Sequence, residues 1–498
     1  MDYIWAAVTE VFSPVPLFMN FLGVLIGMVI GALPGLGSVV AVSICLPFTF
    51  GMAPLQAMAL LLGVYCGSTC GGSIAAVLIN TPGTPQSACT ALDGYPLAKQ
   101  GKGGIAIGWV VAASIFGGIF SCLVLVLAAP SVASFALRFG PLETFGLILM
   151  GFTCISSVSG KNLLKGLASS MIGLLLACVG ASPFTGDMRF TFGLFALHSG
   201  MDVVPVIVGV FALSEIIDRA ERMLHEAPIE VIRSNIVKMP RLREWKGRVG
   251  GLIKSSIIGT FIGILPGTGS TTAAFISYSE ARRTSPRREA FGTGEPDSII
   301  SAEAANNAVT GGALVPSLAL GIPGDPVTAI MLATFVLHGI TPGVRLMQDN
   351  PTIVYGIFIA LIVANLLMWP ACAVTTRLFH YLLKLPEPLL MGIVAVLCVL
   401  GSYGTRGNIN DVTVTVCVGI AAYLLRRGGF PMPPALIAFV LGPQFEMSIN
   451  QMALYRGDQS WFSYIMSSPI ALCLFGVTTL LLFLPHLQRR RQKERAAN

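Results

Sequence analysis

Long apolar stretches alternate along this chain with short polar interruptions. The clearest apolar stretches span residues 17–33, 105–129 and 353–369. Several such stretches reach the roughly 20 residues that a helix needs to cross a hydrocarbon core, and several fall short. Glycine and proline inside them favour helices that stop, restart or bend. The pattern predicts an all-α polytopic membrane protein with about 11 to 14 membrane segments, some of them broken or re-entrant.

One pattern of small and helix-breaking residues occurs twice. Residues 27–38 read G-M-V-I-G-A-L-P-G-L-G-S and residues 259–270 read G-T-F-I-G-I-L-P-G-T-G-S, a displacement of 232 positions. After each break, a Gly-Gly dipeptide and an apolar stretch lead to Pro-Gly-x-Pro, at 71–85 and at 311–326. Transporters built from internal repeats place broken helices at the substrate site. We therefore expect two internal repeats whose breaks meet near the bilayer midplane.

The charged residues are few and unevenly placed. They make up 11% of the chain, where roughly 25% is usual in a soluble domain, and the mean hydropathy is +0.78. The net charge of +7 comes mainly from basic residues at 219–254, 282–288 and 489–495. Because the positive-inside rule places such segments in the cytoplasm, this charge indicates no nucleic-acid partner.

The charge pattern also predicts the organisation of the chain. The expected parts are a first repeat at 1–217, a basic cytoplasmic linker at 218–250, a second repeat at 251–465, and an extra helix with a basic tail at 466–498. No Lys or Arg precedes Lys99, which favours a start outside the cell. With the linker inside, the first repeat crosses an odd number of times, so its tandem copy is inverted. The extra helix then returns the C-terminus to the cytoplasm.

The paired breaks carry hydroxyl groups, one side-chain amide, backbone N–H groups beside glycines and the single acid Asp325, but no Lys or Arg. A helix that restarts at such a break presents three or four unpaired N–H donors and the positive end of its dipole. The dipole favours an anion by roughly 0.3 to 1 kcal/mol. Such a helix end binds a carboxylate without a buried cation, so we expect the substrate there.

The expected substrate-binding residues come from all four motifs: Gly35, Gly37 and Ser38; Asn80, Thr81, Pro82, Gly83 and Thr84; Gly267, Thr268, Gly269 and Ser270; and Pro323, Gly324 and Asp325. A hard cation such as sodium prefers oxygen ligands. We expect a coupling sodium ion near Ser38, Thr81, Ser270 and Asp325. A proton is the alternative, and no other cofactor is expected.

Three further features of the sequence lead to expectations about packing and burial. The glycines at every fourth position before each break favour close helix packing over ligand contact. Glu303 and Asn307 share one helical face, which fits either a functional intramembrane acid or a solvated helix start. Residues 93–96 read as a turn, and residues 187–202 as an interfacial loop with Asp–Arg pairing.

Enzyme chemistry finds little support in the sequence. The eleven cysteines lie mostly in apolar stretches without a C-x-x-C pair, which is typical of small buried side chains. The histidines are scattered without the spacing of metal ligands. Asp325 has Thr84 at the corresponding position of the first motif, so the acid pair of an aspartyl protease is missing. We expect a protein that is not an enzyme.

Several motifs together point to a known family. They are the break at 33–37, Tyr65 with the Gly-Gly segment at 71–74, the run at 80–85, the run Ala-Leu-Asp-Gly-Tyr-Pro at 91–96 and the run Gly-Ile-Pro-Gly at 321–324. In these motifs the chain closely resembles the large membrane subunit, the TctA-type permease, of tripartite tricarboxylate transporters. The resemblance covers nearly the whole chain.

The resemblance implies a secondary transporter of the bacterial inner membrane that imports carboxylates with a cation gradient. Citrate-like tricarboxylates, dicarboxylates and related organic acids are the implied substrates. It also implies two partners, a small membrane subunit of about four helices and a periplasmic protein that binds the substrate and delivers it. The alternative that the residues leave open is a stand-alone carboxylate carrier or a passive channel.

Overall fold

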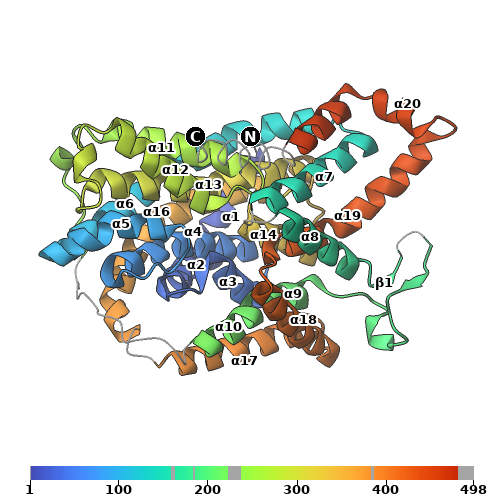
Figure 1. Cartoon of the computed structure of the whole chain (residues 1–498), viewed down its shortest axis with the longest axis horizontal. Coiled ribbons are helices and arrows are strands. Elements are labelled where there is room, and N and C mark those ends of the chain that lie inside the picture. The colour runs from blue at the N-terminus through green and yellow to red at the C-terminus, as the bar shows by residue number, and fades with distance from the viewer. Residues whose placement is uncertain (1, 159–162, 183–184, 223–236, 383–385, 481–498) are drawn as a thin grey trace, which may run out of the picture.

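The computed structural model describes residues 2–158, 163–182, 185–222, 237–382 and 386–480 (Figure 1). The helices before the linker are α1 Asp2–Val11, α2 Pro14–Ala32, α3 Gly37–Cys45, α4 Pro54–Ile79, α5 Ser87–Leu97, α6 Gly103–Ala136, α7 Pro141–Val158, α8 Leu163–Ala177, α9 Val203–Ile207 and α10 Ser214–Arg222. Those after it are α11 Val249–Ile264, α12 Gly269–Thr284, α13 Pro296–Leu320, α14 Pro326–Leu337, α15 Leu346–Asp349, α16 Pro351–Leu382, α17 Glu387–Arg406, α18 Ile409–Arg427, α19 Met432–Arg456 and α20 Trp461–Met466. One short hairpin pairs β1 Gly180–Ala181 with β2 Met188–Arg189.

The architecture is that of an all-α polytopic membrane protein, as the apolar stretches predict. Six of the described helices are long and apolar enough to cross a bilayer: Pro14–Ala32, Pro54–Ile79, Ser87–Ala136, Pro351–Phe379, Pro388–Arg406 and Ile409–Arg427. Shorter apolar helices, among them Gly37–Thr49 and Val249–Ile264, lie beside them. The expected total of about 11 to 14 membrane segments stays a prediction.

Glycine contacts join the helix before each break to a second helix of the same half. At each contact a Cβ atom on the glycine would overlap a backbone carbonyl group, so the two backbones touch. The contacts are Gly27 with Val64 and Gly31 with Ser68 in the first half, and Gly259 with Ala305 and Gly263 with Val309 in the second. The two glycines of the second half lie 232 positions after those of the first half. The residues that they contact lie 241 positions after their counterparts. This agreement supports the predicted duplication.

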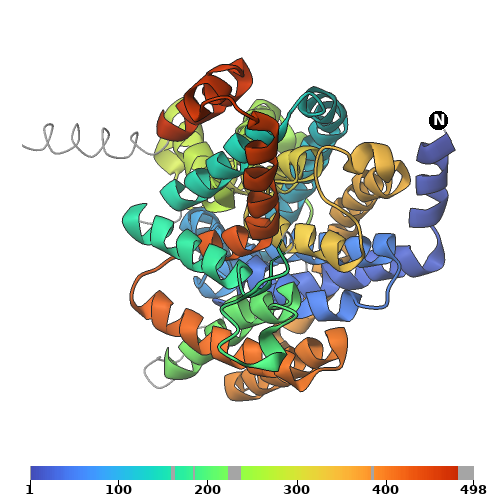
Figure 2. The ribbon, with the colours of Figure 1, turned by 90° about the vertical axis from the view of Figure 1, so that its right-hand side faces the viewer.

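The two halves are interlocked. The long helix α6 of the first half packs against α13 of the second, while α16 of the second packs against α4 of the first. Likewise α19 packs against α7 and α8, whereas the π-helical segment Val208–Leu213 packs against α18. In Figure 1, α2, α3 and α4 lie between a group with α11–α13 and a group with α10, α17 and α18. The peripheral helix α1 contacts α16 and lies at the edge of the molecule (Figure 2).

The turn expected at residues 93–96 is not present, because these residues continue α5 through Pro96. The fully buried Asp93 side chain accepts hydrogen bonds from the backbone N–H groups of Gly292, Gly294 and Glu295, at 2.8 to 3.0 Å. A carboxylate that accepts several backbone N–H bonds is a strong anchor. Asp93 of the first half therefore fixes the loop that leads into α13 of the second.

Residues 187–202 form the β2 strand and a short 3₁₀ turn at Phe195–Leu197, with Phe192 and Phe195 exposed. The predicted pairing of Arg189 with an aspartate of this segment is wrong. Arg189 instead donates to both carboxylate oxygens of Glu446 in α19, at 2.8 and 3.1 Å. This ion pair ties the projecting hairpin (Figure 1) back to the helices.

Only some of the domain boundaries expected from the sequence lie among the described residues. Helix α10, Ser214–Arg222, continues across the expected 217/218 boundary, and the end of the first repeat stays a prediction. A helix at Pro469–Leu480 corresponds to the start of the expected extra segment. Most of the linker, 223–236, and the basic tail, 481–498, lie outside the described residues. The inverted relation of the halves stays a prediction.

Gly27→Ala should destabilise the protein by about 1 to 3 kcal/mol, because the added methyl group would force α2 and α4 apart. Gly392→Ala in α17 is the matched control, since no atom lies within 4 Å of a Cβ atom there. The measurement is the temperature at which the detergent-purified protein loses its monodisperse chromatographic peak. Equal temperatures for the two variants would contradict the packing account.

Candidate functional site

The two breaks share one backbone conformation. Gly35, Gly37, Gly267 and Gly269 all have left-handed φ angles, of 78°, 68°, 82° and 72°. This region is open to glycine but costs other residues roughly 1–2 kcal/mol. Each break ends one helix and starts the next, α2 and α3 in the first half and α11 and α12 in the second. The Pro-Gly-x-Gly pattern therefore produces the helix restarts that were predicted from it.

A cavity of about 1020 Å³ joins the two breaks. Residues 35–40, at the start of α3, and residues 267–272, at the start of α12, both line it. Neither helix has a side-chain hydrogen bond at its N-cap. The first turns of two helices, which carry unpaired N–H groups and positive dipole ends, thus border one space.

Two further residues of the cavity wall connect the halves. Tyr65 in α4 donates a hydrogen bond to Asp325, and both side chains line the cavity. Asp325 also caps α14, since its Oδ1 accepts from the backbone N–H of Thr328 at 2.8 Å. Its carboxylate is therefore already hydrogen-bonded on both oxygens. Tyr65 was not among the expected site residues, because only the folded chain brings α4 against the start of α14.

Arginine side chains reach the cavity from helices that the sequence did not connect to it. Arg426 and Arg427 line the cavity from the end of α18. Arg426 pairs with Glu215 of α10 at 2.6 Å, and a Cβ atom on Gly35 would overlap the Arg219 guanidinium group. The break motifs contain no cation, as noted, but the site as a whole is not free of cations. No local sequence signal links these arginines to the breaks.

The expected site residues separate into two groups. Those of the two breaks, together with Asp325, line the cavity: Gly35, Gly37, Ser38, Gly267, Thr268, Gly269, Ser270 and Asp325. The rest do not line it: Asn80, Thr81, Pro82, Gly83, Thr84, Pro323 and Gly324. From this first-half run the neighbouring Pro85 and Gln86 reach the cavity instead.

Three of the residues that do not line the cavity stabilise the local backbone instead. Asn80 ends α4 with a left-handed φ of 54°, and the Thr81 hydroxyl donates to the Ile79 carbonyl at 3.2 Å. In the second half, the Gly324 carbonyl accepts from the backbone N–H of Gly267 at 2.8 Å. The Pro-Gly-x-Pro loop of the second half therefore supports the break beside it.

The hydroxyl groups at the breaks also differ. The buried Ser38 Oγ has no hydrogen-bond partner among the described residues. Thr268 Oγ1, by contrast, hydrogen-bonds to the carbonyl groups of Ile262 and Leu265 at the end of the preceding helix α11. Of the four residues expected around sodium, Ser38, Ser270 and Asp325 line the cavity and Thr81 does not.

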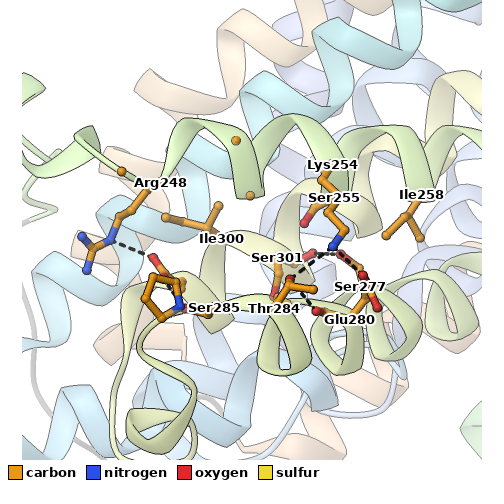
Figure 3. A pocket seen from close by; sticks show the side chains of 16 residues that line it. Arg248, Lys254, Ser255, Ile258, Ser277, Glu280, Thr284, Ser285, Ile300 and Ser301 are labelled. Atoms are coloured by element: carbon orange, nitrogen blue, oxygen red, sulfur yellow. Dashed lines mark hydrogen bonds and ion pairs between the residues drawn. The ribbon is translucent and has the colours of Figure 1, made fainter.

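A smaller cavity of about 220 Å³ lies between α11, α12 and the start of α13 (Figure 3). Its charged side chains are already paired. Lys254 Nζ lies 2.5 Å from Glu280, and Arg248 Nε lies 3.0 Å from Asp297. This second cavity offers a ligand few unpaired groups, so the large cavity is the better candidate site.

Two broken helices whose first turns border one cavity, in an all-α membrane protein, match the arrangement that membrane transport proteins have at their substrate sites. The sequence model of the Tripartite tricarboxylate transporter TctA family matches residues 17–437, and the chain belongs to this family.

Two similar proteins come from Agrobacterium vitis. One, described as "Uncharacterized 52.8 kDa protein in TAR-I ttuC' 3'region", is 36% identical over 486 residues, which is 97% of this chain and 96% of its own length. The other, "Uncharacterized protein in TAR-II ttuC' 3'region", is 34% identical over 239 residues, 47% of this chain and 98% of its own. No solved structure matches the chain.

Tyr65→Phe should lower the stability of the protein by about 1 to 3 kcal/mol, because it leaves a buried carboxylate oxygen of Asp325 without its donor. Tyr403→Phe is the matched control, since Tyr403 is 47% exposed on α17. Thermal unfolding of both variants in the same detergent measures the difference. A Tyr65→Phe variant as stable as the control would show that the contact between α4 and α14 contributes nothing.

Proposed function

We propose that this chain is the large permease subunit of a binding-protein-dependent secondary transporter that imports carboxylates across the bacterial inner membrane with a cation gradient. The observation that carries the proposal is the one cavity bordered by the first turns of both α3 and α12. Each helix N-terminus favours an anion through its N–H groups and its dipole. Two of them at one site favour a ligand with separated negative charges.

The arginines at the cavity complement this arrangement. Arg guanidinium groups bind carboxylates bidentately, and Arg426 and Arg427 line the cavity near the breaks. Because Arg426 already pairs with Glu215, an entering carboxylate competes with a glutamate of the protein for this cation. Such competition keeps the substrate from being held too tightly to be released.

The size of the cavity supports a substrate with more than one carboxylate. Its volume of about 1020 Å³ lies at the upper end of the roughly 300–1,000 Å³ of small-molecule sites. A di- or tricarboxylate can place one carboxylate at each helix start and retain some hydration water. A monocarboxylate reaches only one helix start, so we propose di- and tricarboxylates as the preferred substrates.

The family supports the proposed partners, because a tripartite transporter has components beyond this chain. We propose a small membrane subunit and a periplasmic protein that delivers the substrate. The ion pairs Arg426–Glu215 and Arg427–Glu221 join α18 to α10 beside the cavity. These contacts between the two halves are suited to form and break as the site alternates between the two sides of the membrane.

A binding assay on the purified chain tests the proposed substrate class. Citrate, succinate and acetate are added at equal ionic strength, and the unfolding temperature is measured. We expect saturable stabilisation by citrate or succinate and a weaker effect of acetate, as linkage requires of a ligand that binds the folded state. Stabilisation by acetate alone, or by none of the three, would contradict the proposed class.

Uptake into proteoliposomes separates a transporter from the alternatives. The complete system requires the binding protein and an imposed cation gradient for accumulation. Accumulation by this chain alone under the gradient would indicate a stand-alone carrier. Equilibration without any gradient would indicate a passive channel.

Ser270→Ala should weaken carboxylate binding about fivefold, since a hydrogen bond contributes about 1 kcal/mol. Thr81→Ala is the matched control, because Thr81 does not line the cavity and its hydroxyl bonds to the Ile79 carbonyl. Affinity is measured by calorimetry with the carboxylate that stabilises the wild-type protein best. If Thr81→Ala has the larger effect, the substrate does not occupy the cavity between the breaks.

A further inference from the structure

Glu303 is a fully buried acid that the substrate site does not use. It lies in α13, has no exposed surface and does not line the cavity between the breaks. Helix α13 contacts α4, α5 and α6 around it. The alternative that Glu303 marks a solvated helix start is therefore wrong.

Hydroxyl groups from three helices of the first half surround the Glu303 carboxylate. Ser73 in α4 donates to Oε1 at 2.5 Å, and Thr90 in α5 donates to the same oxygen. Ser114 in α6 donates to Oε2 at 3.1 Å and accepts from Asn307 Nδ2 at 2.8 Å. All of these side chains are at most 1% exposed. The acid thus sits in a shell of protein oxygen atoms.

The same face of α13 carries amide oxygens without partners. Asn306 and Asn307 follow Glu303 by three and four positions, which places them beside it on the helix. Asn306 Oδ1 and Asn307 Oδ1 are buried and have no hydrogen-bond partner among the described residues. A buried polar group without a partner costs about 1–3 kcal/mol. Two such oxygen acceptors beside one acid point to a bound cation.

The charge balance indicates a cation. Among the described residues, none of the ion pairs includes Glu303, and a buried carboxylate without compensation is costly. The fold itself does not need an acid here. At the displacement of 241 positions that relates α13 to α4, the equivalent residue is the buried Leu62.

We propose that Glu303, Ser73, Thr90, Ser114, Asn306 and Asn307 bind a sodium ion, and that this is the ion whose gradient drives transport. One carboxylate balances one monovalent charge. A proton on Glu303 could donate to a single acceptor, whereas sodium coordinates several oxygen atoms at once, including both amide oxygens. The proposal rests on the proposed transport function for its coupling role, and it replaces the sodium position expected at the breaks.

The location also connects the ion to the substrate cavity. Ser73 lies near the end of α4 and Thr90 near the start of α5, so bound sodium would hold together the two helices on either side of the loop 80–86. Pro85 and Gln86 of this loop line the cavity. Loss of the ion would loosen the start of α5 from α4 and alter that wall, while Asp93 further along α5 keeps its bonds to the loop before α13. Sodium binding and substrate binding are coupled in this way.

Binding of radioactive ²²Na⁺ to the purified full-length chain tests the proposal without any substrate. Choline chloride keeps the ionic strength constant. We expect saturable binding by the wild-type protein and at least about tenfold weaker binding by Glu303→Gln, which loses the only negative charge of the site. The exposed Glu10→Gln controls for non-specific charge effects.

Thr90→Val is a second test variant for sodium binding, because it removes one ligand oxygen and keeps the carboxylate. It should weaken sodium binding several-fold even if Glu303→Gln fails to fold. Absence of saturable sodium binding by the wild type, or undiminished binding by Glu303→Gln or Thr90→Val, overturns the proposal. Stabilisation by citrate or succinate, measured on the same preparation, reports on the transport function separately. A chain that binds carboxylate but no sodium would thus refute only the sodium site.

Discussion

Inside a bilayer, every backbone N–H and C=O group needs a partner in the protein or in a water-filled cavity. Helices α2 and α11 end at Pro-Gly-x-Gly breaks, and α3 and α12 restart there. Each restart leaves several N–H groups unpaired. The fold meets this constraint by bringing both restarts to one cavity, and an anion bound there would pair with these groups. Binding of such an anion would therefore offset part of the free-energy cost of interrupting the two helices.

Close helix packing holds the two breaks beside this cavity. The glycines of α2 and α11 let their partners α4 and α13 approach to backbone contact, and the long helices α6 and α16 each pack against the opposite half. Contacts such as Asp93 with the loop before α13, and Tyr65 with Asp325, cross between the halves as well. A movement of one half relative to the other must therefore rearrange these contacts, one of which, Tyr65 with Asp325, lies in the cavity wall.

The breaks were predictable because their signal is local. Proline followed by two left-handed glycines in a Pro-Gly-x-Gly run stops one helix and starts the next at both breaks, so the sequence pattern alone placed α3 and α12. Arg219, Arg426 and Tyr65 could not be assigned to the site, since only tertiary packing brings their helices to the breaks. The turn predicted at Asp93 failed for the opposite reason: packing retained a helix through a sequence of turn-forming residues. The role of Thr81 could not be judged, because lining a cavity is a property of the fold.

The proposed transport function depends above all on a carboxylate binding between the first turns of α3 and α12. Electron cryo-microscopy of the purified chain with the best-binding di- or tricarboxylate tests it most directly. We predict ligand density within hydrogen-bonding distance of backbone N–H groups at both Gly37–Ser38 and Gly269–Ser270. Density confined to the smaller cavity beside Lys254, or contact with only one of the two breaks, would contradict the claim.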